Sequence, residues 1–298
     1  MTPYDIRGGE SSFAPPPARV IVNADDFGYF DNVSAGIIDA ARCGAITATG
    51  ILTNSPAWPG RVEELRAYAN VDLGVHLTLT SGTPLTTGTR GLVDPATGDF
   101  RAGKFGVARA VLSGRLRCEA VEVEWDAQIS RCWKAGIEPV FLNSHEHVHM
   151  FPPLFEVVRR LAWKHGIDWV RWSSPEWFDT TGGAAWTRGA SLQILTWMNR
   201  RAPRVGIPRL IGVNCSGKLD LPWLRKRLDT LRPGGVYELM CHPGMPADGG
   251  NVPASLRNYH HWAGELEALC EAQSLGFFDS PRVQLVRFRD LSVTPALS

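Results

Sequence analysis

Short apolar segments alternate with longer helix-patterned segments along most of this chain. We expect strands at Val20–Ala24, Ile46–Thr53, Leu73–Leu79, Pro139–Asn143, Trp169–Trp172, Leu210–Asn214, Val236–Cys241 and Val283–Phe288. Helices are expected at Val33–Arg42, Trp58–Tyr68, Ala120–Lys134, Leu154–His165, Leu221–Leu231 and Leu256–Leu275. Most of the strand segments are apolar throughout, which is typical of parallel strands covered on both faces. Because parallel strands need crossover connections, the alternation predicts an α/β fold.

Roughly seven or eight such units fit a distorted or incomplete (β/α) barrel, which we predict as a single domain. An open doubly wound sheet is the competing layout. The barrel is expected to span residues 19–298, after a Pro-rich, flexible N-terminal leader at residues 1–18. The segment Thr80–Lys104 is too long for an ordinary connection between a strand and a helix, so we expect it to act as a lid or a substrate wall.

Charge and composition exclude several classes of partner. The net charge of +1 argues against a nucleic-acid partner. No apolar run is long enough for an integral membrane segment, and the N-terminus lacks the pattern of a signal peptide. The 6 cysteines contain no CxxC pair, so we expect free thiols in a reducing compartment and a cytoplasmic location. The sequence gives no oligomeric state, and a homodimer remains open.

A cluster of histidines follows the fourth expected strand. His145, His147 and His149 occupy every second position, in a chain with only 8 histidines. If this segment is extended, the three imidazoles face the same side and can converge on a divalent transition metal. Glu146 would then point to the other side and have a structural role. Periodicity alone allows any of the three histidines to be a ligand.

Polar residues also follow other expected strands. Asp25 and Asp26 follow the first strand, His76 lies on the third, Arg171 is near the end of the fifth, and His242 follows the seventh. Each has a simpler explanation: a helix cap or turn for the aspartates, a core histidine, an ion-paired arginine, and a turn histidine. In a parallel α/β fold, however, reactive groups gather at the carboxyl ends of strands. Their shared position therefore favours one common site.

These residue types suit metal-dependent hydrolysis. Two histidines and one carboxylate hold a catalytic divalent ion and leave a position open for water. The ion acidifies that water and polarises a substrate carbonyl. A second carboxylate can then serve as the general base, and an opposing histidine can protonate the leaving group. The predicted reaction is hydrolysis of an amide or an ester.

Four segments occur in the order seen in the YdjC-like carbohydrate deacetylases, which this chain resembles from about Val20 to Arg289. They are Asn23-Ala24-Asp25-Asp26-Phe27-Gly28, Gly74-Val75-His76-Leu77-Thr78, Ser144-His145-Glu146-His147-Val148-His149 and Cys241-His242-Pro243-Gly244. The resemblance implies a distorted (β/α) barrel, a divalent metal (zinc or magnesium) and removal of acetyl groups from N-acetylated sugars. It also implies a role for each candidate residue. Asp25 would be the base and His242 the acid. The metal ligands would be Asp26, His76 and His145.

The resemblance also implies roles for residues around these ligands. His147, His149 and Arg171 would support the ligands or contact the substrate. Asn143 stands where family members often carry aspartate. We expect it to share the strand face of His145 and to orient that ring without adding charge, which would change metal affinity or identity. The Trp-rich segments at Trp169–Trp172, Trp177 and Trp186 suggest an aromatic wall for an unusual acyl sugar or glycolipid.

The favoured function is a metal-dependent N-deacetylase acting on an acetylated amino sugar or its glycoconjugate. One alternative is a metal-dependent amidohydrolase acting on a non-sugar amide through the same residues. Another is a non-catalytic sugar- or metal-binding protein that keeps the fold. The residues His260 and His261 lie at an expected helix start and are assigned no role.

Overall fold

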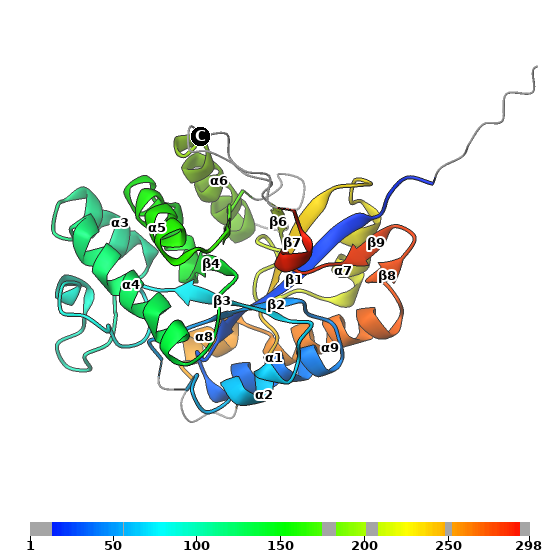
Figure 1. The fold of residues 1–298 in the computed structure, drawn as a ribbon, viewed down its shortest axis with the longest axis horizontal. Helices are drawn as coiled ribbons and strands as arrows, with labels where there is room; N and C mark the ends of the chain where they lie inside the picture. Colours follow the sequence, from blue (N-terminus) through cyan, green and yellow to red (C-terminus); the bar gives the residue numbers. More distant parts are fainter. Residues whose placement is uncertain (1–13, 56, 175–182, 201–207, 248–251, 293–298) are drawn as a thin grey trace, which may run out of the picture.

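The computed structural model describes residues 14–292 apart from position 56 and the segments 175–182, 201–207 and 248–251. Its strands are β1 (Ala18–Phe27), β2 (Ala48–Ile51), β3 (Asp72–Leu77), β4 (Phe141–Ser144), β5 (Trp169–Val170), β6 (Arg209–Ile211), β7 (Val236–Cys241), β8 (Asp279–Ser280) and β9 (Val283–Leu285). Parallel pairing gives the order β5-β4-β3-β2-β1-β7-β6 (Figure 1). β9 pairs with the first residues of β1 and forms a short antiparallel pair with β8.

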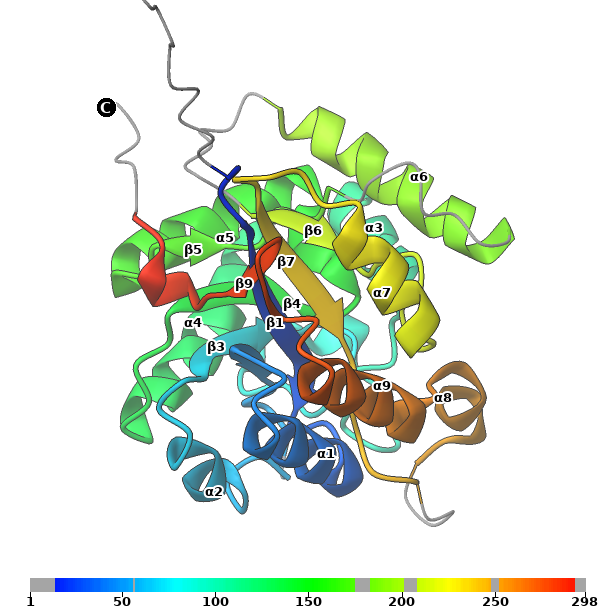
Figure 2. The same ribbon diagram turned by 90° about the vertical axis from the view of Figure 1, so that its right-hand side faces the viewer.

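Helices surround this sheet (Figure 2). They are α1 (Asp31–Arg42), α2 (Val62–Arg66), α3 (Lys104–Leu112), α4 (Cys118–Lys134), α5 (Pro152–His165), α6 (Gly183–Met198), α7 (Leu221–Asp229), α8 (Ala254–Tyr259) and α9 (Trp262–Ser274). Short 3-10 turns, η1 (Arg90–Leu92), η2 (His145–Met150) and η3 (Phe288–Asp290), complete the set. The sequence did not predict α3 and α6, and the single helix expected at Leu256–Leu275 is divided into α8 and α9.

The sheet is strongly curved. β5 and β1 stand four positions apart in the strand order, which would separate them by about 19 Å in a flat sheet. Arg171, the residue after β5, nevertheless contacts Asp25 of β1 at 2.6 Å and Glu238 of β7 at 2.7 Å. Within the described part of the chain, no strand pairing joins β5 to β6. The result is a mixed α/β domain with a curved parallel sheet whose closure into a barrel is not shown.

An apolar layer fills the concave side of the sheet below the polar site, towards the start of β1. It consists of Ile21, Ala48, Phe141, Trp169, Val286, Phe288 and Leu291. The ring of Phe288 in η3 stacks on Phe141 at 4.6 Å and closes this end. Because strand side chains alternate between faces, Asn23 and Asp25 share the face of Ile21 at successively higher levels. The polar site is therefore built on a rigid apolar base.

The predicted loop Thr80–Lys104 forms part of a wall. The buried carboxylate of Glu124 in α4 accepts hydrogen bonds from the Leu85 and Thr86 amides at 3.0 and 2.8 Å. Thr80 and Lys104, at the two ends of the segment, line the main cavity. These bonds fix the segment to α4, which favours the interpretation as a wall.

Two predictions concern the chain's N-terminus and membranes. Ala18, assigned to the leader, is the first residue of β1 and is buried. The rest of the proposed leader lies largely outside the described residues. None of the described helices is long and apolar enough to cross a bilayer.

The expectation of six free thiols is wrong. Cys43, which follows α1, forms a disulfide with Cys270 of α9, 227 residues away in sequence. The other four cysteines are thiols. Packing of α1 against α9 brings the two sulfurs together, and no local spacing reveals such a pair. The cytoplasmic location, which depended partly on free thiols, stays a prediction.

Removing this disulfide is expected to lower the free energy of unfolding by about 2–4 kcal/mol, because the crosslink restricts the unfolded chain. Urea unfolding of the wild type and of Cys43→Ser, each with and without reductant, measures the effect. Reductant should destabilise the wild type and leave the variant unchanged. Titration of six thiols in unreduced, denatured wild type would contradict the disulfide.

Candidate metal and catalytic site

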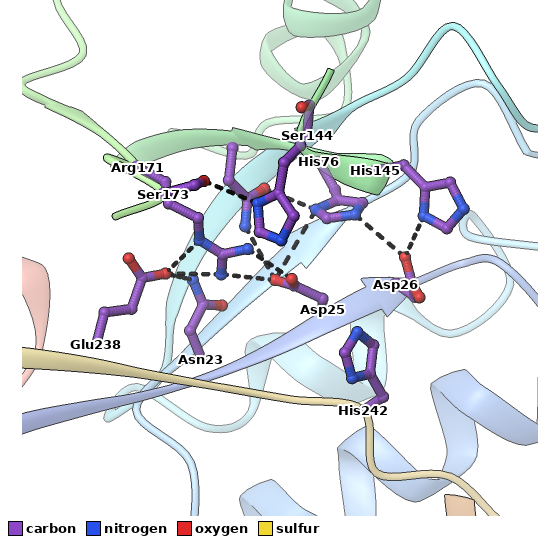
Figure 3. Close-up of polar contacts among 12 residues, drawn as sticks. Asn23, Asp25, Asp26, His76, Ser144, His145, Arg171, Ser173, Glu238 and His242 are labelled. Carbon is purple, nitrogen blue, oxygen red and sulfur yellow. Dashed lines mark hydrogen bonds and ion pairs between the residues drawn. The ribbon is translucent and has the colours of Figure 1, made fainter. Parts of the chain in front are cut away.

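Three side chains from separate strands converge at one end of the sheet (Figure 3). Asp26 lies near the end of β1, His76 on β3, and His145 directly after β4. Asp26 Oδ1 is 3.1 Å from His76 Nε2 and 2.9 Å from His145 Nδ1. One ligand atom from each residue lies within 4.8 Å of those of the other two. Two imidazoles and one carboxylate in this arrangement fit the donor set of a catalytic divalent metal.

The charge state of this group also suits a cation. Burial opposes ionisation of Asp26, but His145 and His76 outweigh it and hold the pKa of that carboxyl well below its usual range. Burial likewise opposes protonation of His145, yet the Asp26 carboxylate raises the pKa of this imidazole. The site thus stabilises a buried anion by placing positive charge beside it, a role that a metal ion would fill.

The side chains of Asp25 and Asp26 both serve the site because β1 is irregular there. Consecutive strand residues normally point to opposite faces. Asp26 adopts a left-handed φ of 74°, and the register between β1 and β2 shifts between Ala24 and Phe27. A left-handed backbone conformation costs about 1–3 kcal/mol for a residue other than glycine, and it is often found at functional sites.

Arg171 holds the carboxylate of Asp25. Its Nη1 and Nη2 donate to the two Asp25 oxygens at 2.6 and 2.9 Å. Burial works against the charged form of Asp25, but the guanidinium outweighs it and lowers the pKa of that carboxyl. The ion pair proposed for Arg171 as a simpler explanation thus exists, and its partner is the carboxylate beside the metal triad.

A second acid completes this network. Arg171 Nε donates to Glu238 Oε1 at 2.8 Å, and Asn23 donates to the same oxygen at 2.7 Å (Figure 3). The two carboxylates raise the pKa of the buried Arg171 despite its loss of hydration. Sequence reasoning missed Asn23 and Glu238. The available signal was Glu238, a charged residue inside the apolar strand Val236–Cys241. It lies four residues before His242, so the strand pattern places the two on the same face.

Asn143 links the base candidate to a ligand candidate. Its Oδ1 is 2.7 Å from His76 Nδ1, and its Nδ2 donates to Asp25 Oδ1 at 2.9 Å. If His76 carries its proton on Nδ1, the lone pair of Nε2 is left free to bind a metal ion. The expectation that Asn143 orients His145 is wrong, since the ring of His145 bonds to Asp26 instead.

The histidine cluster is not extended. Residues 145–150 form η2, and Glu146 and His147 have left-handed φ values of 52° and 56°. The strand face that was to gather His145, His147 and His149 therefore does not exist. Only His145 joins the metal group. Glu146 lines the cavity and accepts a hydrogen bond from the Lys104 amide at 3.1 Å.

The other two histidines make structural contacts. His147 Nδ1 lies 2.8 Å from Ser173 Oγ, and its ring borders the cavity. His149 is fully buried and bonds to Ser144 Oγ at 2.5 Å and to the Arg171 carbonyl at 2.9 Å. Burial lowers the pKa of His147 well below its usual value and that of His149 to about 3, so both rings are neutral. His149 positions backbone around the site and does not line the cavity.

His242 follows β7 and borders the cavity near the carboxylates (Figure 3). Its amide donates to Glu265 Oε2 at 2.6 Å, and its Nδ1 lies 4.0 Å from the same oxygen. Burial raises the pKa of Glu265, a residue of α9 with 0% exposure. His260, which was assigned no role, faces His242 with ring centroids 5.1 Å apart and also lines the cavity. Sequence reasoning did not identify Glu265 or His260, because α8 and α9 reach the site only through tertiary packing.

These groups open into one cavity of about 640 Å³. Its aromatic lining consists of Tyr29, Phe105, Phe151 and Tyr259, with histidines beside them. The predicted tryptophan wall is wrong for the described residues. Trp169 and Trp172 are buried away from the cavity, and Trp186 is 56% exposed outside it. Trp177 lies outside the described residues.

Comparison with known proteins agrees with this architecture. The family model of YdjC-like protein matches residues 19–280. A carbohydrate deacetylase of Brevibacillus brevis is 34% identical over 92% of this chain and 99% of its own length. One from Halalkalibacterium halodurans is 40% identical over 50% of this chain and 62% of its own length.

A solved structure from Enterococcus faecalis shares the fold. It is described as a candidate cellobiose-phosphate cleavage protein, is 24% identical, and superposes with a TM-score of 0.69 over 93% of this chain and 99% of its own. The family match covers all five residues proposed for the site, Asp25, Asp26, His76, His145 and His242. On this evidence the chain belongs to the YdjC-like protein family.

Proposed function

We propose that this protein is a metal-dependent hydrolase that removes the acetyl group from an N-acetylated amino sugar or its glycoconjugate. The arrangement of Asp25 carries this proposal: a carboxylate kept ionised by Arg171, beside the donor group of Asp26, His76 and His145. The relatives from Brevibacillus brevis and Halalkalibacterium halodurans, described as carbohydrate deacetylases, support sugar deacetylation as the reaction.

Each residue then has a chemical role. A divalent ion held by Asp26, His76 and His145 would polarise the acetyl carbonyl and acidify water. Asp25 accepts the proton of the attacking water, and Arg171 keeps its carboxylate ionised and fixed in orientation. His242, which lines the same cavity as the metal group and Asp25, donates a proton to the leaving amine. Glu265 fixes the backbone that carries His242.

Acetate release tests this proposal. Protein stripped by a chelator and refilled with zinc, magnesium, manganese or cobalt is given N-acetylglucosamine, its short oligomers, and acetylated glycolipids. We expect acetate only from metal-loaded protein. Acetate from simple non-sugar amides alone would indicate an amidohydrolase. Bound metal with no release from any substrate would indicate a binding protein.

Replacing Asn143 with aspartate is expected to tighten metal binding about tenfold, because a carboxylate behind His76 makes it a stronger ligand. The same carboxylate would face that of Asp25 and raise its pKa, since like charges oppose ionisation. As the pH is lowered, Asn143→Asp should therefore lose activity at a higher pH than the wild type does. Metal competition titrations and pH–rate profiles measure the two effects, with Asn258→Asp on the exposed surface of α8 as the matched control. Unchanged metal affinity in Asn143→Asp would contradict the proposed contact with a ligand.

A further inference from the structure

Helix α6 has an outer face on which large apolar side chains are exposed. Four of them are Trp186, Ile194, Trp197 and Met198, each 50% exposed or more. At about 100° per residue, these four side chains fall within about 120° of the helix surface. They therefore form one stripe, which we call the α6 stripe. Figure 2 shows α6 at the edge of the molecule, outside β6 and α7.

The opposite side of α6 is also apolar, and it is covered. Leu192 is buried in a cluster with Leu210 of β6 and Met240 of β7. Arg188, Leu192 and Leu195 line the cavity. A helix that is apolar on all sides is normally covered on all sides. The exposure of the α6 stripe therefore marks a surface whose partner is not among the described residues.

An exposed tryptophan elsewhere on the surface has different surroundings. Trp163 of α5 is 88% exposed. Next to it along the helix, Lys164 pairs with Asp126 at 2.8 Å, and Arg160 pairs with Glu122 at 2.6 Å. A single apolar side chain among paired charges is common on protein surfaces and needs no partner, whereas a contiguous apolar stripe indicates an interaction site.

The charge around the α6 stripe indicates the chemistry of its partner. The stretch from residue 180 to 219, which contains α6, has no aspartate or glutamate. Its cationic residues are Arg188, Arg200, Arg201, Arg204, Arg209 and Lys218. Because the whole chain has a net charge of +1, the remainder is net negative. Arg200 is exposed, and its guanidinium carbon lies 4.2 Å from the centre of the Trp197 ring.

Exposed tryptophans beside arginines are typical of helices that lie on anionic membranes. The indole ring sits at the level of the lipid headgroups, and the guanidinium pairs with lipid phosphates. A second copy of this chain fits the α6 stripe less well. A twofold interface through α6 would place the same acid-free, cationic stretch on both sides, and like charges oppose association.

We infer that the α6 stripe, with the arginines that follow it in sequence, docks reversibly on the surface of a membrane that contains anionic lipids. Helix α6 would lie parallel to that surface, with its apolar outer face at headgroup depth. Thr187 and Ser191 are exposed on α6 and also line the cavity, so the docked face borders the cavity. This inference goes beyond the proposed function and does not depend on the reaction.

The test is cosedimentation of the full-length protein with lipid vesicles. One set contains phosphatidylcholine alone, and the other contains equal amounts of phosphatidylcholine and the anionic phosphatidylglycerol. The variants are Trp197→Gln and Arg200→Gln. The matched controls are Trp163→Gln on α5 and Arg115→Gln, an exposed arginine between α3 and α4. Thermal unfolding checks that each variant is folded, and sedimentation velocity without vesicles gives the oligomeric state.

Wild-type protein is expected to bind the anionic vesicles about tenfold or more tightly than the neutral ones. Added salt should weaken this binding, because it screens the arginines from the lipid phosphates. Trp197→Gln should weaken binding about tenfold, the loss typical of an aromatic side chain that is no longer buried. Arg200→Gln should weaken it about fivefold, as expected for one cation near an anionic surface. The two control variants should bind as the wild type does.

Absence of wild-type binding to anionic vesicles at low salt would overturn the inference. An equal loss in Trp163→Gln and Trp197→Gln would overturn it too, since any exposed tryptophan would then serve. A dimer that dissociates in Trp197→Gln, without vesicle binding, would assign the α6 stripe to a second copy of the chain. Acetate release from a water-soluble substrate should be the same in Trp197→Gln as in wild type, so failure of docking and failure of the proposed reaction are distinguishable.

Discussion

Replacing Asp25 with asparagine is expected to lower kcat for acetate release by about 10²- to 10⁴-fold, the range typical of losing a general base. The amide keeps the size of the side chain and cannot accept the proton of the attacking water. Arg171 loses one of its two carboxylate partners and keeps Glu238 at 2.7 Å. The fold should therefore survive, with a modest loss of stability from the half-paired guanidinium.

The decisive measurement on Asp25→Asn is kcat together with metal content. Metal should stay bound, because the variant leaves Asp26, His76 and His145 in place. Asp229→Asn, which alters an exposed carboxylate at the end of α7, is the control and should behave as wild type. Activity within a few-fold of wild type would show that another group is the base. Loss of metal from Asp25→Asn would place Asp25 among the ligands instead.

Replacing His76 with alanine is expected to abolish tight metal binding and to lower kcat/KM by about 10²- to 10⁴-fold. This range corresponds to losing several kcal/mol of stabilisation in the transition state. His76 is 2% exposed and supplies one of the two imidazoles beside Asp26, so its loss leaves too few donors for a catalytic ion. Chelation of the wild type should have the same effect, and added zinc or magnesium should reverse it only in the wild type.

Metal content after dialysis and acetate release are measured in parallel. His165→Gln, which changes a histidine paired with Asp126 away from the cavity, is the control and should retain both. A wild type that works equally well in excess chelator would exclude metal dependence. In that event the contacts between Asp26 and the two histidines would be structural ion pairs.

Much of the architecture follows from local pattern. Continuous apolar runs placed β1, β3 and β7 within a few residues of their observed bounds, because a buried parallel strand must be apolar on both faces. Polar residues at the ends of those runs marked Asp25, Asp26, His76 and His242 as neighbours, since parallel strands bring their carboxyl ends to one edge. The family resemblance, confirmed by the match to the YdjC-like family model, narrowed the three histidines of the cluster to His145.

The parts that local pattern misjudged depend on backbone and long-range contacts. Left-handed conformations at Glu146 and His147 turn the expected strand into η2 and separate the three histidines. No periodicity reveals such conformations, because they are stabilised by surrounding packing. The Cys43–Cys270 disulfide arises likewise from packing between helices at opposite ends of the chain.

Residue types and their order along the chain were enough to indicate a parallel α/β protein with a metal-type site at its strand ends. Only the curved sheet decided which partners those residues have. Arg171 reaches Asp25 and Glu238 because curvature brings β5 close to β1 and β7. Glu265 and Arg188 reach the site because the helices that carry them, α9 and α6, pack beside it in the folded chain. Hydrophobic periodicity specifies which face of an element is buried, and the polar contacts across a curved core depend on distances that exist only after the chain has folded.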